Sequence, residues 1–378
     1  VIGIEQVVDV ELAADLHPAQ REALAEADVD LEADHRRGWI GVGDLDDVPR
    51  RDRVQTFGCG RRGRFARAVA RVGLPALIKA SAGGGGKGMR IAYSSGEVAE
   101  GFARAKSEAA SSFGDDRVFV EKFIVNPRHI EIQVLGDGRG HAIHLGERDC
   151  SLQRRHQKLV EESPSPALTA KVREEFLAKA AKAIGAAGYE NVGTLEFLVG
   201  PDGKPYFIEI NCRIQVEHPV TEMVTGIDLV ELQIALANGE KMPYAQGDVV
   251  RTGHAIEFRL TAEDPTQNFR PQAGEITGFR SPSGPWVRFD SHLYAGYEVP
   301  PYYDSLLAKL IVWGPTREAA IARSRAALRE VEIDGVATTR DFFLGLLESE
   351  DFLKGRTTTA YLDEIGTAAI LAAAPRTG

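Results

Sequence analysis

Two acidic side chains and one amide in the middle of the sequence have a spacing that suits metal binding. Residues 195–199 and 206–210 have the composition of two strands joined by a tight turn, and in that hairpin Glu196 lies opposite Glu209. Directly opposed side chains lie about 5 Å apart, where two carboxylates repel each other unless a cation lies between them. Asn211 falls on the same face and adds a carbonyl oxygen. Three oxygen ligands favour Mg²⁺ or Mn²⁺.

The hairpin prediction assumes a two-residue turn at Asp202 and Gly203, and a wider loop centred on the same point would keep the pairing. Beyond Asn211, polar residues continue to alternate with apolar ones, which predicts that the strand carries a charged ladder on one face. Its further members are Arg213, Gln215 and Glu217. The resulting strand would be long, so residues 213–217 could instead form a loop. An ordinary half-exposed strand is the alternative, but its polar side would more often carry Thr, Lys and Ser.

A glycine-rich segment, residues 82–88, suits phosphate binding because glycine lets backbone N–H groups approach an anion closely. Lys87 within it and Lys79 before it supply positive charge. It differs from a dinucleotide-binding fingerprint because residues 89–92 resemble a strand rather than a helix. It differs from a P-loop because Gly88 replaces the Ser or Thr. The sequence predicts a glycine-tipped hairpin that folds over a triphosphate, with a flexible surface loop as the alternative.

A basic cluster lies between residues 146 and 160 of a chain that is acidic overall. Such a cluster can hold phosphate and bicarbonate through charge-assisted hydrogen bonds, or it can be a solvated loop paired with the Glu residues that follow. Together with a nucleotide loop and a metal site, it indicates a ligase that uses ATP to activate an oxyanion. The members of the cluster are Arg148, Arg154, Arg155, His156 and Lys158.

The elements that must position these side chains include both strands and helices, so the predicted fold class is α+β. Strands are predicted at residues 74–79, 89–93, 118–123, 129–135, 195–199 and 206–210. Helical periodicity predicts helices at residues 169–187, 228–237 and 317–330.

Composition limits the class of protein. The 378 residues carry a net charge of -10, which argues against nucleic acid as the main partner because phosphate-backbone binding needs an excess of Lys and Arg. The three cysteines are too few and too scattered for a disulfide framework. The sequence contains no apolar run of about 18 residues and no signal-peptide pattern, so a cytoplasmic protein without membrane association is expected, with an organellar protein whose transit peptide is missing as the alternative.

Several motifs resemble those of the biotin carboxylase family, an ATP-grasp family. The similarity runs from about residue 67 to about residue 365 and is carried by many motifs at once. They are KAS with the glycine loop (79–88), EKF (121–123), NPRH (126–129), ERDCS (147–151), QRRHQK (153–158), EINCRIQVEHP (209–219), EFR (257–259) and PPYYDS (300–305).

The resemblance assigns a role to each matching residue. The ATP ligands it implies are Lys79, Gly85, Gly86, Glu121, Lys122, Phe123, Ile124, His129, Gln153, His156, Glu196 and Glu209. The metal ligands it implies are Glu196, Glu209 and Asn211. The bicarbonate ligands it implies are Lys158, Arg213, Gln215, Val216 and Glu217. Glu217 would be the base, Arg259 would bind biotin, and the catalytic set would be Lys158, Arg213, Glu217 and Arg259.

The same resemblance implies an ATP-grasp fold with a glycine-rich flap and a C-terminal biotin carboxylase domain. The family opens with a doubly wound lobe, and the residues before Lys79 do not resemble it, so that lobe is predicted to be missing or degraded. The predicted divisions are an atypical, disordered or frame-shifted segment 1–65, a flap 66–123, a catalytic core 124–250, a C-terminal domain 251–366 and a tail 367–378.

The implied function is the first half-reaction of a biotin-dependent acyl-CoA carboxylase, such as the acetyl-CoA carboxylase of fatty acid biosynthesis. Carboxyphosphate forms from ATP and bicarbonate, and its CO₂ passes to N1′ of biotin. No Ala-Met-Lys-Met biotin attachment site is present in this sequence, so biotin is expected on a carrier protein or on a lost C-terminal portion. Expected partners are that carrier, the carboxyltransferase subunits and a second copy in a homodimer. The alternatives are a catalytically impaired ATP-binding fragment or assembly subunit, and another ATP-grasp ligase.

Overall fold

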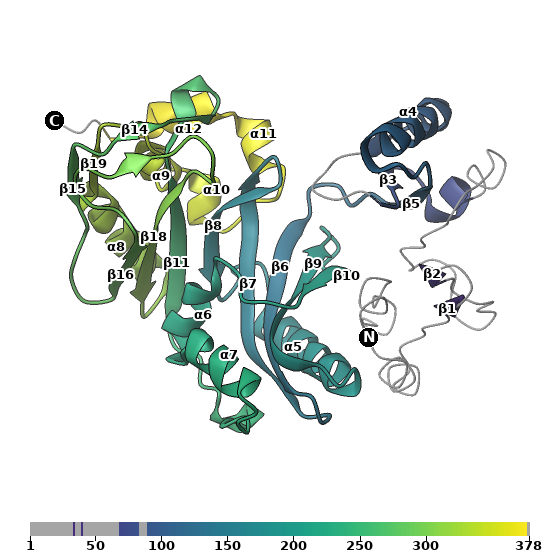
Figure 1. Ribbon diagram of the computed structural model, residues 1–378, viewed down its shortest axis with the longest axis horizontal. Helices are drawn as coiled ribbons and strands as arrows, with labels where there is room; N and C mark the ends of the chain where they lie inside the picture. Colours follow the sequence, from purple (N-terminus) through teal and green to yellow (C-terminus); the bar gives the residue numbers. More distant parts are fainter. Residues whose placement is uncertain (1–32, 35–38, 41–67, 83–88, 376–378) are drawn as a thin grey trace. The chain divides into compact units, whose positions relative to one another are not determined.

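A computed structural model of the chain describes residues 33–34, 39–40, 68–82 and 89–375 (Figure 1). Strands β1 (Ala33–Asp34) and β2 (Trp39–Ile40) form an antiparallel pair. Most of the predicted segment 1–65 and the tip of the glycine loop, with Gly85 and Gly86, lie outside the described residues. The chain divides into two compact units, residues 1–125 with 200–207 and residues 126–199 with 208–378.

Besides β1 and β2, the described part of the first unit contains a three-stranded sheet, helix α4 (Ser95–Phe113) and a helical segment at residues 68–72. Strand β3 (Ala76–Ala80) lies between β4 (Arg90–Ala92) and β5 (Val118–Lys122), and both neighbours are antiparallel to it. Helix α4 buries one apolar face in the same core as the sheet. It ends at Gly114, whose left-handed backbone lets its N–H bond the Ala110 carbonyl. The predicted antiparallel pairing of the strands on either side of the glycine loop is therefore confirmed.

The second unit is built on an eight-stranded sheet with the order β10-β9-β6-β7-β8-β11-β18-β16. All the pairings from β9 to β16 are antiparallel. The strands are β6 (Arg128–Asp137), β7 (Ala142–Arg154), β8 (Gln157–Ser163), β9 (Glu190–Val199), β10 (Pro205–Asn211), β11 (His254–Thr261), β16 (Val287–Ser291) and β18 (Leu306–Gly314).

Helices cover this sheet, and the three that were predicted in it are confirmed. Helix α5 (Ala170–Ala186) packs on β7 and β6, α7 (Leu229–Ala237) packs on β9, and α8 (Arg317–Glu330) packs on β18 and β11. Each begins after an N-cap, Thr169, Asp228 or Thr316, whose side chain accepts a backbone N–H. In the part of the chain that the structure describes, no helix is long and apolar enough to span a membrane.

Shorter elements complete the second unit. Helix α6 (His218–Thr225) packs against β7, β8 and β11. The C-terminal helices are α9 (Arg340–Leu346), α10 (Glu350–Leu353), α11 (Tyr361–Ile365) and α12 (Thr367–Ala373). The remaining strands are β12 (Glu263–Asp264), β13 (Arg270–Pro271), β14 (Gly274–Glu275), β15 (Gly278–Arg280), β17 (Glu298–Val299) and β19 (Glu332–Asp334).

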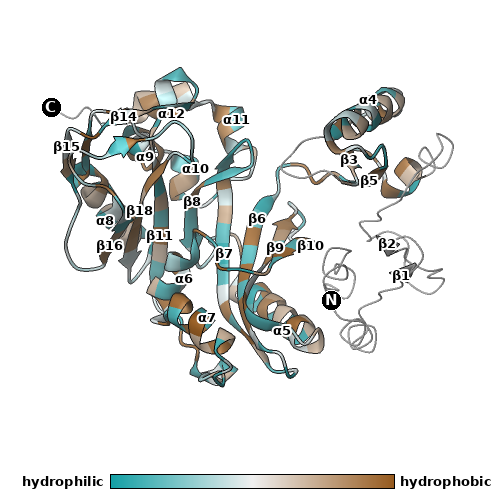
Figure 2. Cartoon of the chain, viewed as in Figure 1, coloured by the Kyte–Doolittle hydropathy of each residue, from teal (hydrophilic) through white to brown (hydrophobic). Residues whose placement is uncertain are grey.

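The central strands carry polar residues into the interior. Along β6, His129, Glu131 and Gln133 alternate with apolar residues, and all of them are buried. Figure 2 shows the resulting hydrophilic and hydrophobic bands along β6 and β7. Because successive side chains of a strand point to opposite faces, these three polar residues share one face of the sheet. Buried polar groups need partners, so this face is where an internal polar network must form.

Two predictions for the hairpin around residue 202 need correction. Gly200 donates its N–H to the Lys204 carbonyl at 3.0 Å, so the turn is wider than the two residues assumed. Gly203 has φ of 76°, a conformation that costs glycine little. The charged ladder does not continue as a strand, since β10 ends at Asn211, and the alternative of a loop at residues 213–217 is confirmed. Residues 213–217 are a loop because the chain must turn there into α6, which begins at His218.

Candidate active site

The side chain of Lys158 on β8 lies at the centre of a buried group of carboxylates. Its Nζ donates to Oε1 of Glu131, to Oε1 of Glu217 at 2.7 Å and to Oε1 of Glu196 at 3.1 Å. Burial alone would lower the pKa of Lys158, but these neighbouring carboxylates outweigh it and raise the pKa above the usual range. The ammonium group therefore stays charged and joins three strands and the loop before α6.

Glu131 on β6 is the main anion of the group, and the sequence prediction missed it. It is fully buried, and its Oε2 accepts from Nη2 of the fully buried Arg148 at 3.0 Å. Burial would raise the pKa of Glu131, but Lys158 and Arg148 outweigh it and lower the pKa to about 2. The alternation of His129, Glu131 and Gln133 with apolar residues predicts a strand but does not show that its polar face is buried.

Arg148 was predicted as an anion ligand, but its guanidinium is used within the protein. It donates to several side chains on β6, β9 and the segment around α6. Besides Glu131, the acceptors are Gln133 (2.5 Å), Gln215 (3.0 Å), Thr221 (3.1 Å) and Thr194 (3.2 Å). Arg148 therefore fixes the elements around Glu131 and Gln215 relative to one another.

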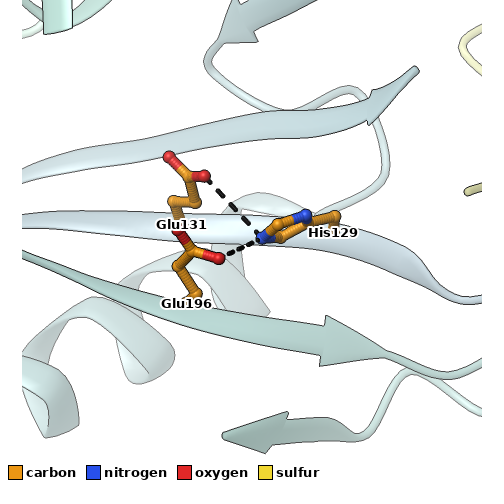
Figure 3. A group of neighbouring side chains, drawn as sticks. All are labelled: His129, Glu131 and Glu196. Atoms are coloured by element: carbon orange, nitrogen blue, oxygen red, sulfur yellow. Dashed lines mark hydrogen bonds and ion pairs between the residues drawn. The ribbon is translucent and has the colours of Figure 1, made fainter. Parts of the chain in front are cut away.

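Glu196 on β9 is bound by several donors. Its Oε2 lies 2.9 Å from Nε2 of His129, which is also 3.7 Å from Oε1 of Glu131 (Figure 3). Its Oε1 accepts from Gln215 Nε2 at 2.7 Å as well as from Lys158. Burial raises the pKa of Glu196, but the His129 hydrogen bond and the positive charges outweigh it and lower the pKa to about 2. Glu196 is thus an anionic oxygen donor at any physiological pH.

The three predicted metal ligands are neighbours. Asn211 Nδ2 donates to Oε1 of Glu196 at 2.9 Å and to Oε1 of Glu209 at 3.2 Å, so a single amide bridges the two carboxylates. Arg213 Nη2 donates to the Asn211 carbonyl oxygen at 3.1 Å. If the Asn211 side-chain amide rotates so that its oxygen faces the two carboxylates, all three metal ligands are oxygen atoms. Such a ligand set fits Mg²⁺ or Mn²⁺. Ligand atoms of His129, Glu131 and Glu196 also lie within 4.8 Å of one another.

Glu217 is held between two cations. Its Oε1 accepts from Lys158, and its Oε2 accepts from Arg259 Nη2 at 3.0 Å. Arg259 on β11 also donates from Nε to Oε1 of Glu161 at 2.6 Å. Burial lowers the pKa of Arg259, but Glu161 and Glu217 outweigh it and raise the pKa. A buried carboxylate oriented by two fixed cations can accept a proton from an anion bound beside them.

Gln215 and Val216 adjoin this group, whereas Arg213 is exposed. The Val216 carbonyl accepts from Lys309 Nζ at 3.0 Å, which fixes the loop before Glu217. Arg213 contacts Asn211 and the Ile214 carbonyl rather than Glu217. The structure thus brings together most of the predicted bicarbonate ligands and leaves Arg213 at the edge of the group.

The predicted basic cluster separates into two parts. Arg148 and Lys158 point inward, whereas Arg155 and His156 form the exposed tip of the β7–β8 hairpin with φ of 49° and 66°. Arg154 donates to Asn268 instead of the Glu residues of β8. Gln153 lies opposite Lys158 in the hairpin register. The cluster is therefore a strand hairpin and not one solvated loop.

The predicted ATP ligands of the first unit follow β3 and β5. Lys79 Nζ lies 2.5 Å from Oε2 of Glu121 on the neighbouring strand. Lys122 Nζ donates to the Leu74 carbonyl at 2.8 Å, and the Phe123 N–H donates to the Pro75 carbonyl at 3.1 Å. These bonds fix the segment that leads to Ile124.

Comparison with known proteins gives two matching family models. Residues 61–245 match the model described as "Carbamoyl-phosphate synthase L chain, ATP binding domain". Residues 257–364 match the model described as "Biotin carboxylase C-terminal domain".

The chain is similar to curated proteins. It is 54% identical over 296 residues to the chloroplastic biotin carboxylase of Arabidopsis thaliana, a match that covers 78% of this chain and 55% of that protein. It is 52% identical over 293 residues to biotin carboxylase 1 of Bacillus subtilis, a match that covers 77% of this chain and 65% of that protein. The chain therefore spans less than two thirds of the length of these relatives.

Among solved structures, the chain resembles the biotin carboxylase domain dimer of Hydrogenobacter thermophilus 2-oxoglutarate carboxylase. That structure is described as a complex with MgADP, ADP and bicarbonate. The TM-score is 0.78 at 46% sequence identity, and the match covers 84% of this chain and 71% of that one.

Proposed function

This chain belongs to the biotin carboxylase family, and we propose that it uses ATP and bicarbonate to carboxylate biotin on a carrier protein. The observation that best supports this is the Glu217 carboxylate between Lys158 and Arg259. Two cations attract a small anion to this place, and the carboxylate can take its proton. The bicarbonate bound in the related Hydrogenobacter structure agrees with such an anion site.

In the proposed reaction, bicarbonate binds beside Glu217, which removes its proton. Its other ligands would be Lys158, Arg213, Gln215 and the backbone of Val216. A bicarbonate oxygen then attacks the γ-phosphorus of ATP, and ADP leaves. The carboxyphosphate breaks down to CO₂ and phosphate, and the phosphate takes the proton from N1′ of biotin. The biotin enolate attacks CO₂.

Arg259 would stabilise that enolate, with help from Arg213. A guanidinium suits this role because it stays charged and donates in a fixed planar fork. Arg259 is already held rigidly by Glu161 and Glu217, so little reorganisation is needed when the negative charge forms.

ATP and its divalent cation have their own proposed ligands. Glu196, Glu209 and Asn211 would hold Mg²⁺ or Mn²⁺, which when bound neutralises charge on the phosphates. The further ATP ligands proposed are Lys79, Gly85, Gly86, Glu121, Lys122, Phe123, Ile124, His129, Gln153 and His156. The bridging of two carboxylates by Asn211 supports the metal assignment.

The proposed domain limits are 66–123 for the flap, 124–250 for the catalytic core and 251–366 for the C-terminal domain. The proposed setting is a cytoplasmic homodimer that works with a biotin carboxyl carrier protein and a carboxyltransferase. The dimer named in the Hydrogenobacter structure supports the self-association.

The test is the rate of ADP release from ATP with bicarbonate, measured with and without free biotin. We expect stimulation by biotin, and Glu217→Gln should lower the stimulated rate by at least about 100-fold while nucleotide binding persists. The exposed Glu240→Gln serves as a control that keeps the rate. ATP binding without turnover would support an impaired subunit, and ATP cleavage indifferent to biotin would support another ATP-grasp ligase.

A further inference from the structure

We propose that Glu161 and Glu257 form a carboxyl pair that holds one proton between them and positions Arg259, and through it the base Glu217. This inference rests on the proposed function, because it assigns a purpose to the orientation of Glu217. The two residues are positioning residues, since the cation and not the pair contacts Glu217.

The register of the sheet places the two carboxyl groups together. Glu161 on β8 and Glu257 on β11 are directly opposed partners of an antiparallel pair. Opposed residues point to the same face, with Cβ atoms about 5 Å apart. Both side chains are fully buried, so water does not separate their charges.

Hydrogen bonding around the pair is incomplete. Oε1 of Glu161 accepts from Nε of Arg259 at 2.6 Å, with Nη2 at 2.5 Å. Oε2 of Glu161 and both carboxyl oxygens of Glu257 have no hydrogen-bond partner among the described residues. An ionised carboxylate without a partner is costly to bury, and two adjacent carboxylates cannot both ionise easily. A proton held between Glu257 and the free Glu161 oxygen removes both costs.

The surrounding charges lead to the same conclusion. Burial raises the pKa of Glu161 to about 7 against the opposing effect of Arg259. Burial, and next the charge of Glu161, raise the pKa of Glu257 well above its usual value. The titratable and charged groups that face the pair are Arg259, Lys309, Lys158, Glu217 and Cys150.

Arg259 is shared between Glu161 and Glu217, so the charge on the pair determines how strongly Arg259 stabilises the Glu217 carboxylate. A single negative charge on Glu161 holds Arg259 in place and weakens its effect on Glu217. In Glu161→Gln, Arg259 forms an ion pair with Glu217 and no longer with Glu161. The stronger pairing stabilises the Glu217 carboxylate and makes it a weaker base. Glu257→Gln replaces an already neutral group by a neutral amide and should leave the geometry unchanged.

The first experiment needs no activity and compares melting temperatures of wild type and Glu257→Gln at several pH values. A carboxyl whose pKa is raised on folding costs stability as pH rises from its unfolded pKa through its folded pKa. The gain in melting temperature from Glu257→Gln should therefore be larger at pH 8 than at pH 5. A difference that does not change with pH overturns the proposal. The exposed Glu100→Gln should show no such trend.

If Glu257→Gln fails to fold, infrared spectroscopy of the wild type tests whether the pair holds a proton. The C=O stretch of a protonated carboxyl group should persist at pH 8, and its absence overturns the pair.

The second experiment measures the pH profile of biotin-stimulated ATP cleavage. Glu161→Gln should lower kcat on the order of ten-fold and move the acidic limb to lower pH, with little change in KM for ATP. Glu257→Gln should keep kcat at pH 7 within about two-fold and lose the alkaline limb. A Glu161→Gln profile that is merely scaled down overturns the positioning role. An inactive wild type whose melting temperatures follow the expected trend contradicts the proposed function and leaves the proton pair intact.

Discussion

At the scale of single residues, the site is organised around one buried anion, Glu131. It accepts from both Lys158 and Arg148, and it is fully enclosed. An ion pair of this kind adds little net stability compared with apolar residues, but removing one partner leaves uncompensated charge in the interior. Glu131 therefore keeps two cations in place rather than supplying chemistry itself.

Replacing Glu131 by Gln should lower the free energy of unfolding by about 3 to 5 kcal/mol, because Lys158 and Arg148 lose their main anion. Urea unfolding measures the change. Glu100→Gln, which removes an exposed i,i+4 ion pair with Arg104, should change it by less than about 1 kcal/mol. Equal effects in the two variants would contradict the role given to Glu131.

Buried carboxylates with lowered pKa values predict the acid sensitivity of the second unit. Burial opposes ionisation of Glu162, but His254 and Arg317 outweigh it and lower its pKa to about 2, as also found for Glu131 and Glu196. A depressed folded pKa gives stability that is present above the unfolded pKa and lost as pH falls through the folded one.

Stability should therefore fall between about pH 4.5 and pH 2, the range between the unfolded and folded pKa values. The measurement is the urea midpoint as a function of pH. Glu162→Gln should flatten part of this dependence. Parallel curves for wild type and Glu162→Gln would show that Glu162 does not contribute.

The metal ligands could be predicted from the sequence because adjacent strands joined by a short turn bring Glu196, Glu209 and Asn211 near one another, although the two-residue register assumed for them was wrong. Glu131 could not be predicted as a site residue, because an acidic residue in an alternating strand has the same sequence pattern whether it faces water or the interior. Its cation partners come from β7 and β8, and the order of strands in the sheet is not contained in local periodicity. Arg259 was identified through a family motif and not through spacing, whereas Lys158 was first noticed as a member of the basic cluster.

At the scale of elements, strand β6 depends on close contact with the chain around Tyr189. A Cβ at Gly136 would lie 2.0 Å from the Tyr189 carbonyl oxygen. The Arg128–Asp137 strand pairs with β9 on one side and β7 on the other, so it cannot move away easily. Helix and strand positions with strong periodicity were predictable. The end of β10 was left open between a strand and a loop, because the polar alternation runs on into the loop and only strand length argued against it.

Gly136→Ala should destabilise the second unit by about 1 to 3 kcal/mol through overpacking against the Tyr189 backbone. Thermal unfolding measures it. Gly247→Ala is the matched control, since a Cβ there meets nothing within 4 Å. Equal melting temperatures for the two variants would show that the contact between Gly136 and Tyr189 contributes little to stability.

At the scale of the whole molecule, family models match residues 61–245 and 257–364, but the chain spans less than two thirds of the length of these curated relatives. Its only methionines are Met89, Met223 and Met242, and none belongs to a Met-Lys-Met attachment site. These 378 residues should accordingly carry no covalent biotin, and under the proposed function they should carboxylate biotin that is attached elsewhere.

Streptavidin blotting and measurement of the intact mass test whether the chain carries covalent biotin. Transfer of labelled carboxyl groups to an added biotinylated carrier tests whether biotin attached elsewhere is the substrate. The same carrier lacking biotin is the control. Covalent biotin on this chain would contradict the assignment.

The most direct test of the account follows the oxygen atoms of bicarbonate. If a bicarbonate oxygen attacks the γ-phosphorus, ATP cleavage in the presence of ¹⁸O-labelled bicarbonate and biotin must place one labelled oxygen in the phosphate released. The account predicts this label in phosphate from the wild type, with formation of labelled phosphate largely lost in Glu217→Gln. Phosphate that carries only oxygen from water would contradict it, because that result means hydrolysis of ATP without carboxyphosphate.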